Sequence, residues 1–171
     1  PRGLVVDLWG SATMRTAGEE FAMALHLAGL APKWDDGSAR VSGFEILPLA
    51  ILGRPRIDVT LRVSGLFRDV FPTLAQLFEA GAEALSQRDE TPADNPYTTR
   101  SARVFGPKPG LYGLGMGTAA DTFTDEARAA AGEAWLSASS WAIGPDGQST
   151  EAREALEQRI LASDSFVHAQ D

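Results

Sequence analysis

The hydrophobic pattern of this chain switches repeatedly between a strand period and a helix period. Residues 4–9, Leu-Val-Val-Asp-Leu-Trp, are almost continuously apolar, as in a parallel strand that is covered on both faces. Residues 57–63 alternate between aliphatic and polar side chains, whereas residues 21–28 and 74–85 carry apolar side chains at helical spacing. Strands that alternate with helices predict an α/β fold, with a mostly parallel sheet flanked by helices in a layered domain of the Rossmann or flavodoxin type.

Local signals indicate where the two helices begin and end. Thr16 and Glu19 have the spacing of a capping box, so we expect a helix to start there. Gly29 is placed to end that helix in the left-handed conformation, and Pro72 suits the first turn of the second helix.

Shorter elements are predicted from turn residues and from brief local patterns. They are a hairpin with arms at residues 32–35 and 39–41, strands at 44–47 and 102–105, a loop at 89–100, an alanine-faced helix capped by Thr124, a helix at about 150–162, and a strand near Phe166. Parallel sheets bind ligands at the carboxyl ends of their strands, which directs attention to residues 9–15 and 64–69.

Size and composition predict one domain without a membrane span. The chain has 171 residues, enough for a single core. No apolar run approaches the ~20 residues that cross a bilayer. The first residue, Pro1, stands directly before a strand pattern, so we expect residues 1–171 to be a single α/β domain or part-domain cut from something longer.

Charge and residue types exclude several classes of function. The net charge of −8 argues against nucleic acid as the main partner. The absence of cysteine excludes disulfides and thiolate chemistry and is compatible with a cytoplasmic location. The chain has no P-loop motif, and residues 115–120 fit the loose form G-x-G-x-x-A without the strand that must precede a dinucleotide loop.

The segment after the first strand holds one group of candidate site residues, namely Trp9, Gly10, Ser11, Arg15 and Glu19. In one interpretation these residues only end a strand and cap a helix. In the other, Trp9 offers an aromatic face, Gly10 and Ser11 offer approachable backbone, and Arg15 offers a cation for carboxylates. The sequence leaves both interpretations open.

The segment after the alternating strand holds a second group, namely Ser64, Gly65, Phe67, Arg68 and Asp69. In the structural interpretation, Asp69 caps the following helix, Arg68 pairs with a carboxylate and Phe67 fills the core. In the functional interpretation, Gly65 lets the backbone approach a planar ligand, Phe67 packs on that ligand and Arg68 meets its acidic group. The two interpretations use different atoms, so Asp69 can cap the helix while Arg68 faces a ligand.

The two histidines differ in their surroundings. His26 lies on an apolar helix and is interpreted as a packing or surface residue. His168 and Asp171 end the last predicted strand, where they could hold a metal or pass on a proton. Two ligands do not define a metal site, so no metal-binding residues are assigned.

Four segments together resemble one protein family, that of the large cobaltochelatase subunit CobN and its porphyrin-binding relative in magnesium chelatase, the H subunit. They are VVDLWGSATMRTAGEE (residues 5–20), LGRPRIDVTLRVSGLFRDVFP (52–72), RVFGPKPGLYGLG (103–115) and FVHAQD (166–171), and they span nearly the whole chain. The WGSATMRT, DNP and VHAQD segments favour the cobalt type.

The resemblance implies a region of the large, tetrapyrrole-binding subunit of an ATP-dependent cobaltochelatase, a ligase that forms nitrogen–metal bonds in aerobic cobalamin biosynthesis. Such a subunit binds a metal-free corrinoid, hydrogenobyrinate a,c-diamide. Cobalt is its substrate metal, and two AAA+ ATPase partner subunits use the ATP. This chain is expected to bind no cofactor of its own. The expected location is the cytoplasm. Family subunits are several times longer and carry a histidine- and glutamate-bearing segment that this chain lacks, so the isolated chain is expected to be inactive.

Chelation chemistry assigns roles to the candidate residues. A macrocycle requires aromatic and aliphatic walls, cations for its carboxylates, and bases for the protons that the ring nitrogens release. The two strand-end groups are the candidate substrate-binding residues, and Glu19, His168 and Asp171 are the candidate catalytic residues, with Asp69 as a further base. The alternatives are a magnesium chelatase H-subunit region that inserts magnesium into protoporphyrin and a non-catalytic docking module for the AAA+ partners.

Overall fold

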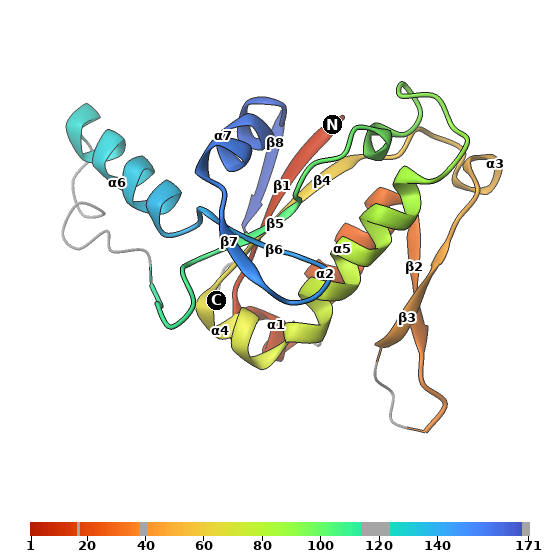
Figure 1. Ribbon diagram of the computed structural model, residues 1–171, viewed down its shortest axis with the longest axis horizontal. Helices are drawn as coiled ribbons and strands as arrows, with labels where there is room; N and C mark the ends of the chain where they lie inside the picture. Colours follow the sequence, from red (N-terminus) through yellow and green to blue (C-terminus); the bar gives the residue numbers. More distant parts are fainter. Residues whose placement is uncertain (17, 38–40, 114–123, 169–171) are drawn as a thin grey trace.

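The main sheet has its parallel strands at the centre. A computed structural model describes residues 1–16, 18–37, 41–113 and 124–168. Its six-stranded sheet has the order β7-β6-β5-β4-β1-β8 (Figure 1). The strands are β1 (Gly3–Leu8), β4 (Asp58–Val63), β5 (Val104–Gly106), β6 (Trp141–Ile143), β7 (Ser149–Glu151) and β8 (Ser165–His168).

The predicted mostly parallel α/β sheet is confirmed. Strand β1 pairs in parallel with both β4 and β8, and β4 pairs in parallel with β5. Strands β6 and β7 add an antiparallel hairpin at one edge, which the sequence pattern did not predict. Each of these two strands has only three residues, too few to show an alternation.

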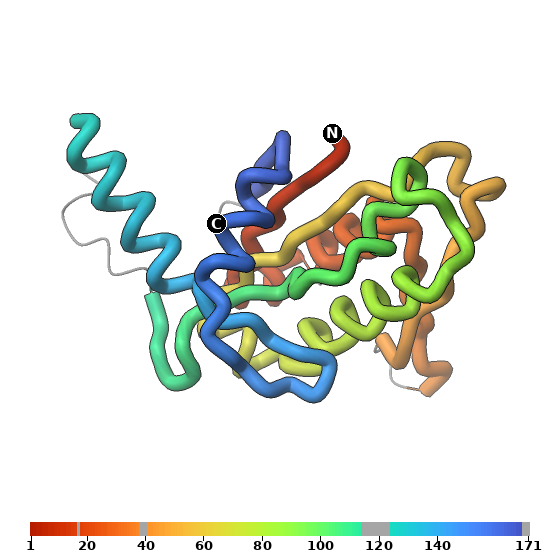
Figure 2. The backbone as a smooth tube through the Cα atoms, turned by 45° about the horizontal axis from the view of Figure 1, so that its top comes forward, coloured from red at the N-terminus to blue at the C-terminus, as the bar shows by residue number. Residues whose placement is uncertain are grey.

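Helices cover the two faces of the sheet unequally. The described helices are α1 (Gly10–Thr16), α2 (Glu19–Ala28), α3 (Leu49–Leu52), α4 (Gly65–Val70), α5 (Pro72–Ser86), α6 (Asp125–Ser137) and α7 (Arg153–Leu161), with a short 3-10 turn at Pro96–Thr98. Helices α2 and α5 cover one face, and α7 lies on the other (Figure 1). Figures 1 and 2 both show α6 extending away from the body, and none of its residues is buried.

The larger core lies between the sheet and helices α2 and α5. Alternate side chains of β1 and β4 point into it, and Phe21 and Leu25 of α2 meet them from the other side. A separate hairpin of β2 (Leu30–Trp34) and β3 (Val41–Ile46) stands beside this layer, as predicted from its turn. The hairpin is longer than predicted, because residues 44–47, expected as a separate strand, belong mostly to β3.

The polar side chains of β4 are buried and do not form a solvent-facing row. Thr60 and Arg62 are inaccessible to solvent, as are the aliphatic residues that alternate with them. Arg159 of α7 donates from Nε to Thr60 Oγ1 at 2.9 Å and forms an ion pair with Asp58. The strand is therefore covered on both faces, and its second face is held by charge pairing.

The segment between β1 and α2 differs from the predicted capping box. Helix α1 begins directly after Trp9 and ends at Thr16, whose Oγ1 donates to Glu20 Oε2 at 2.6 Å. Helix α2 begins at Glu19 after Gly18, which adopts a left-handed conformation. The predicted end of α2 is confirmed, because Gly29 has φ = 82°.

Within the described residues, no helix combines the length and the apolar character that crossing a membrane requires.

Candidate functional site

The two strand-end groups lie at one edge of the sheet. Ser64 caps α4, and its Oγ accepts hydrogen bonds from Phe67 N at 3.1 Å and from Gly10 N at 3.2 Å. One hydroxyl therefore ties the start of α4 to the end of β1. Residues 9–15 and 64–69, which the strand-end rule selected separately, therefore lie side by side at the carboxyl edge.

A buried ion pair lies just inside this edge. Asp7 of β1 and Arg62 of β4 occupy paired positions of the two strands, and Arg62 Nη1 lies 3.5 Å from Asp7 Oδ1. Only 3% of Asp7 and 1% of Arg62 is exposed. Burial lowers the pKa of Arg62 from its usual value, and the negative charge of Asp7 opposes that shift.

His168 is the accessible end of the same arrangement. Its Nδ1 lies 3.2 Å from Asp7 Oδ2, and Trp9 Nε1 donates to that same oxygen at 3.2 Å. The Trp9 ring meets His168 edge-on at 6.1 Å and lies 5.4 Å from the Arg62 guanidinium. We name Asp7, Trp9, Arg62 and His168 the carboxyl-edge network; 42% of the His168 side chain is exposed.

Sequence reasoning identified two members of this network and missed the other two. Asp7 was interpreted only as part of an apolar strand, and Arg62 only as part of a polar strand face. The available signal was a single carboxylate inside a run that is otherwise apolar. A charge at such a position requires a partner, and Arg62 supplies it.

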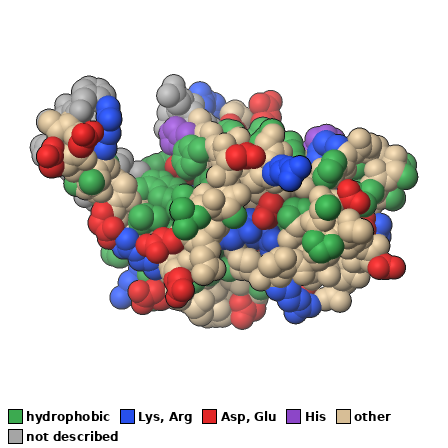
Figure 3. Space-filling view, turned by 90° about the horizontal axis from the view of Figure 1, so that it is seen from above, with side chains coloured by type: hydrophobic (Ala, Val, Ile, Leu, Met, Phe, Trp, Pro, Cys, Tyr) green, Lys and Arg blue, Asp and Glu red, His purple; other side chains and the backbone are tan. Residues whose placement is uncertain are grey.

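An apolar hollow adjoins the network on the same face of the sheet. It has a volume of about 310 Å³ and is lined by Val5, Trp135, Leu136, Ile160 and Phe166. Strand alternation places Val5 beside Asp7 and Phe166 beside His168. Figure 3 shows apolar side chains gathered between the projecting α6 and the body.

Arg68 and Asp69 hold a loop of the protein itself. Arg68 Nη1 donates to the carbonyls of Pro107 and Lys108 at 2.9 and 3.2 Å, and its Nε donates to Asp69 Oδ1. Tyr112 donates its hydroxyl to Asp69 Oδ2. These hydrogen bonds lower the pKa of Asp69, with the bond from Arg68 as the main cause.

Two predictions for this segment are wrong. Asp69 lies inside α4 and does not cap α5, whose first turn has no side-chain cap. Phe67 is completely buried and packs against Phe71, so it has no surface to offer a planar ligand. Helix α4 directs the Phe67 ring into the hydrophobic core, so the ring is not available to a ligand.

Gly65 lets the loop at residues 107–112 lie directly on α4. A Cβ atom at this position would stand 2.7 Å from the Leu111 carbonyl oxygen and 2.7 Å from a Tyr112 ring carbon. We therefore expect Gly65→Ala to displace the loop and to speed chymotrypsin cleavage after Tyr112 several-fold. Gly43→Ala is the matched control because no atom lies within 4 Å of its Cβ position. Equal cleavage rates in both variants would show that the loop does not depend on this contact.

The remaining candidates are spread around the edge. Ser11 and Arg15 lie exposed on α1, and Glu19 lies exposed in the first turn of α2. In the described part of the chain, no hydrogen bond or ion pair joins Glu19 to His168. Asp171 and the G-x-G-x-x-A segment at 115–120 lie outside the described residues. Among the described residues, no group of three or more metal-ligating side chains could hold an ion.

Comparison with known families gives a match over the whole chain. Residues 1–171 match the family described as CobN/Magnesium Chelatase. The chain belongs to this family. The CobN/Magnesium Chelatase assignment confirms the resemblance that the sequence segments indicated.

Individual members of the CobN/Magnesium Chelatase family align over almost the whole chain. The chain is 41% identical to "Aerobic cobaltochelatase subunit CobN" of Pseudomonas aeruginosa, with 99% of the chain and 15% of that protein covered. It is 35% identical to the magnesium-chelatase H subunit of Rhodobacter capsulatus, with coverage of 95% and 15%. The structure of the catalytic subunit of cobaltochelatase from Mycobacterium tuberculosis matches with a TM-score of 0.89 at 32% identity, over 100% of this chain and 16% of that one. The chain thus spans about 15% of the length of the relatives it matches.

Proposed function

We propose that this chain forms one wall of the tetrapyrrole-binding cleft in the large subunit of an ATP-dependent cobaltochelatase. In this proposal the subunit inserts cobalt into hydrogenobyrinate a,c-diamide in cobalamin biosynthesis, and AAA+ partner subunits hydrolyse the ATP. Support comes from the family assignment and from the names of the relatives. The identity to the cobalt-type relative is 41%, against 35% for the magnesium-type relative, which favours cobalt.

One observation carries the proposal, namely that an apolar hollow adjoins a buried charge network with one accessible imidazole. Trp135 and Phe166 meet edge-on at 6.1 Å and provide aromatic surface for a flat macrocycle. His168 lies on the strand that also carries Phe166 and follows it by two positions on the same face. A ring that rests in the hollow would thus have its edge near the imidazole.

The carboxyl-edge network suits the uptake of protons. Metal insertion replaces two protons on the ring nitrogens by one divalent cation, so two protons must leave. In this proposal the Nδ1–H of His168 donates a hydrogen bond to Asp7 Oδ2, which fixes the tautomer and leaves Nε2 as the proton acceptor for the ring. Arg62 forms an ion pair with Asp7 Oδ1, and Trp9 Nε1 donates to Oδ2, so both carboxylate oxygens are held in place.

The two predicted arginines have different roles in this proposal, one in direct contact with the ring and one through a loop. Arg15, exposed on α1, remains our candidate cation for the peripheral carboxylates of the ring. Arg68 acts indirectly in this proposal, because its guanidinium fixes the loop at residues 107–112 beside the edge.

Binding of the metal-free corrinoid tests the proposal. In the full-length polypeptide, Phe166→Ala is expected to weaken the binding of hydrogenobyrinate a,c-diamide roughly tenfold, because it removes an aromatic wall. The affinity is read from quenching of tryptophan fluorescence, with inner-filter correction. Phe166 is half exposed, so its loss should leave the fold intact.

The matched control is Leu161→Ala, which removes a strongly exposed side chain of α7 outside the hollow. It should leave the affinity unchanged. Protoporphyrin serves as the comparator ligand, and tighter binding of protoporphyrin would favour the magnesium-type function. Equal affinity for the corrinoid in the wild type and in Phe166→Ala would contradict the proposed wall and leave the docking of AAA+ partners as the stronger alternative.

A further inference from the structure

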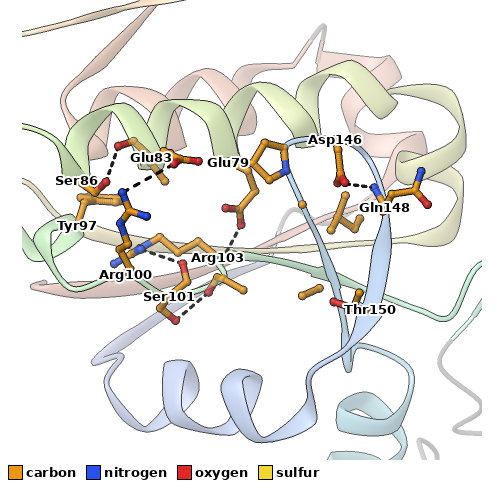
Figure 4. Close-up of a pocket in the computed structure, with 16 residues that line it drawn as sticks. Glu79, Glu83, Ser86, Tyr97, Arg100, Ser101, Arg103, Asp146, Gln148 and Thr150 are labelled. Carbon is orange, nitrogen blue, oxygen red and sulfur yellow. Dashed lines mark hydrogen bonds and ion pairs between the residues drawn. The ribbon is translucent and has the colours of Figure 1, made fainter.

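A second cavity lies on the other side of the sheet from the apolar hollow. It has a volume of about 510 Å³, within the range of small-molecule sites, and it is bounded by α5, the segment at residues 97–103 and the β6–β7 hairpin (Figure 4). Its walls include the apolar side chains of Ala82, Ala142 and Ile143. Nothing in the proposed chelation chemistry uses this cavity.

Glu79 places a nearly buried carboxyl group in the wall of this cavity. Only 8% of the residue is exposed. Its Oε1 accepts hydrogen bonds from the backbone N–H groups of Arg103 and Val104 at 2.7 and 2.8 Å. In the described part of the chain no hydrogen bond reaches Oε2, and Figure 4 shows the carboxyl group directed from α5 toward the cavity. Burial raises the pKa of Glu79, which reports how poorly its charge is solvated.

The nearby arginines do not pair directly with this carboxylate. Arg103 Nε forms an ion pair with Asp58 Oδ1 at 3.0 Å, and the Arg103 guanidinium lies over the Tyr97 ring, 4.5 Å from its centroid. Arg100 is largely exposed and stands 3.9 Å from Glu83.

Two more carboxylates line the cavity, and one of them, Glu83, is paired with Arg100. Glu83 follows Glu79 by one turn of α5, and Asp146 stands on the hairpin that forms the facing wall. Asp146 uses Oδ1 to accept the Gln148 N–H at 3.0 Å. The cavity thus presents one buried acceptor oxygen, the outer carboxylate of Asp146 and the Glu83–Arg100 ion pair between apolar walls.

We propose that this cavity binds a primary ammonium group carried on an aliphatic chain, with Glu79 Oε2 as its main acceptor. A guanidinium would pair with both oxygens of a carboxylate, but the backbone already occupies Oε1. An ammonium is a compact charge that pairs with one oxygen, and its alkyl chain would lie along the apolar walls. The ammonium is either that of a free alkylamine or that of a lysine side chain from another polypeptide segment.

The test uses the full-length polypeptide and pentylamine as the ligand, with titration calorimetry as the measurement. Pentylamine is expected to bind, and 1-pentanol, which has the same chain without the charge, is not. Glu79→Gln should weaken pentylamine binding roughly tenfold or more, because it removes the charge but keeps the oxygen that the two backbone N–H groups require. Glu154→Gln makes the same change at an exposed position of α7 and should have no effect.

A second variant and a second measurement separate the remaining outcomes. Asp146→Asn keeps its turn-forming oxygen, lies at the surface and should weaken binding by a smaller factor than Glu79→Gln. If the wild type binds no free amine, carbodiimide coupling followed by peptide mass spectrometry identifies a lysine joined to Glu79, which would show that a protein segment supplies the ammonium. Equal binding in Glu79→Gln and the wild type, or the absence of both amine binding and a Glu79–lysine amide, would overturn the proposal. Neither result bears on tetrapyrrole binding in the apolar hollow.

Discussion

Arg62→Met is expected to destabilise the centre of the sheet by about 3–5 kcal/mol, because it removes the buried cation that pairs with Asp7 Oδ1 and leaves only the Trp9 and His168 contacts on Oδ2. Ser139 Oγ, which now accepts from Arg62 Nε at 2.8 Å, would lose its donor as well. Hydrogen exchange of the β1 and β4 amides in the full-length polypeptide measures the loss where it occurs.

Two further variants make this expectation specific. Combining Arg62→Met with Asp7→Leu should restore much of the protection, because removing both charges also removes their desolvation cost. Arg153→Met is the matched control, since Arg153 forms its ion pairs with Glu133 and Glu157 at the surface, and it should have a much smaller effect. Unchanged exchange in Arg62→Met would show that the Trp9 and His168 contacts are enough to hold Asp7 in the sheet.

His168→Ala is expected to slow cobalt insertion about 100-fold or more while leaving corrinoid affinity within a few-fold of the wild type. This expectation rests on the proposed function, in which the imidazole accepts a ring proton in the rate-limiting step. The measurement is the rate of cobalt insertion by the complete complex with its ATPase subunits. Imidazole added to the His168→Ala complex should restore part of the rate.

His26→Ala is the matched control and should leave the rate unchanged, because His26 is exposed on α2 and lies outside the carboxyl-edge network.

Asp7→Asn should also slow insertion, because an amide oxygen holds the imidazole tautomer less firmly than a carboxylate does. A His168→Ala complex with a normal rate would place the proton acceptor elsewhere. A loss of affinity without a loss of rate would make His168 part of the binding wall alone.

Local patterns were sufficient to predict the two central strands, β1 and β4, and the edge of the sheet at which they end. The apolar run before Trp9 and the alternation up to Val63 each identify a central strand, and the rule for parallel sheets places their ends together. The same patterns could not pair Asp7 with Arg62, because that requires the alignment of two strands that lie more than 50 residues apart. The sequence therefore identified Trp9 and His168 as candidate site residues, but not Asp7 and Arg62.

Side-chain direction was the second limit of the sequence interpretation. Phe67 and Arg68 are neighbours, and the sequence does not show that α4 buries the first and turns the second toward the loop at residues 107–112. Helix α6 illustrates the converse case. Its alanine-rich face predicted an inward side, but none of its residues is buried, because an apolar face is covered only where another segment reaches it.

The position of the Asp7–Arg62 pair also bears on how the chain selects its fold. Asp7 stands within an apolar run that is buried on both faces and would tolerate several alignments against β4 on hydrophobic grounds alone, and Arg62 alternates with the aliphatic residues of β4. A shift by one residue would turn the face of every following side chain and set Asp7 and Arg62 apart inside the core. Such misaligned states contain two isolated buried charges, so the pair separates the native topology from its nearest competitors by an energy gap that an all-aliphatic pair of strands would lack.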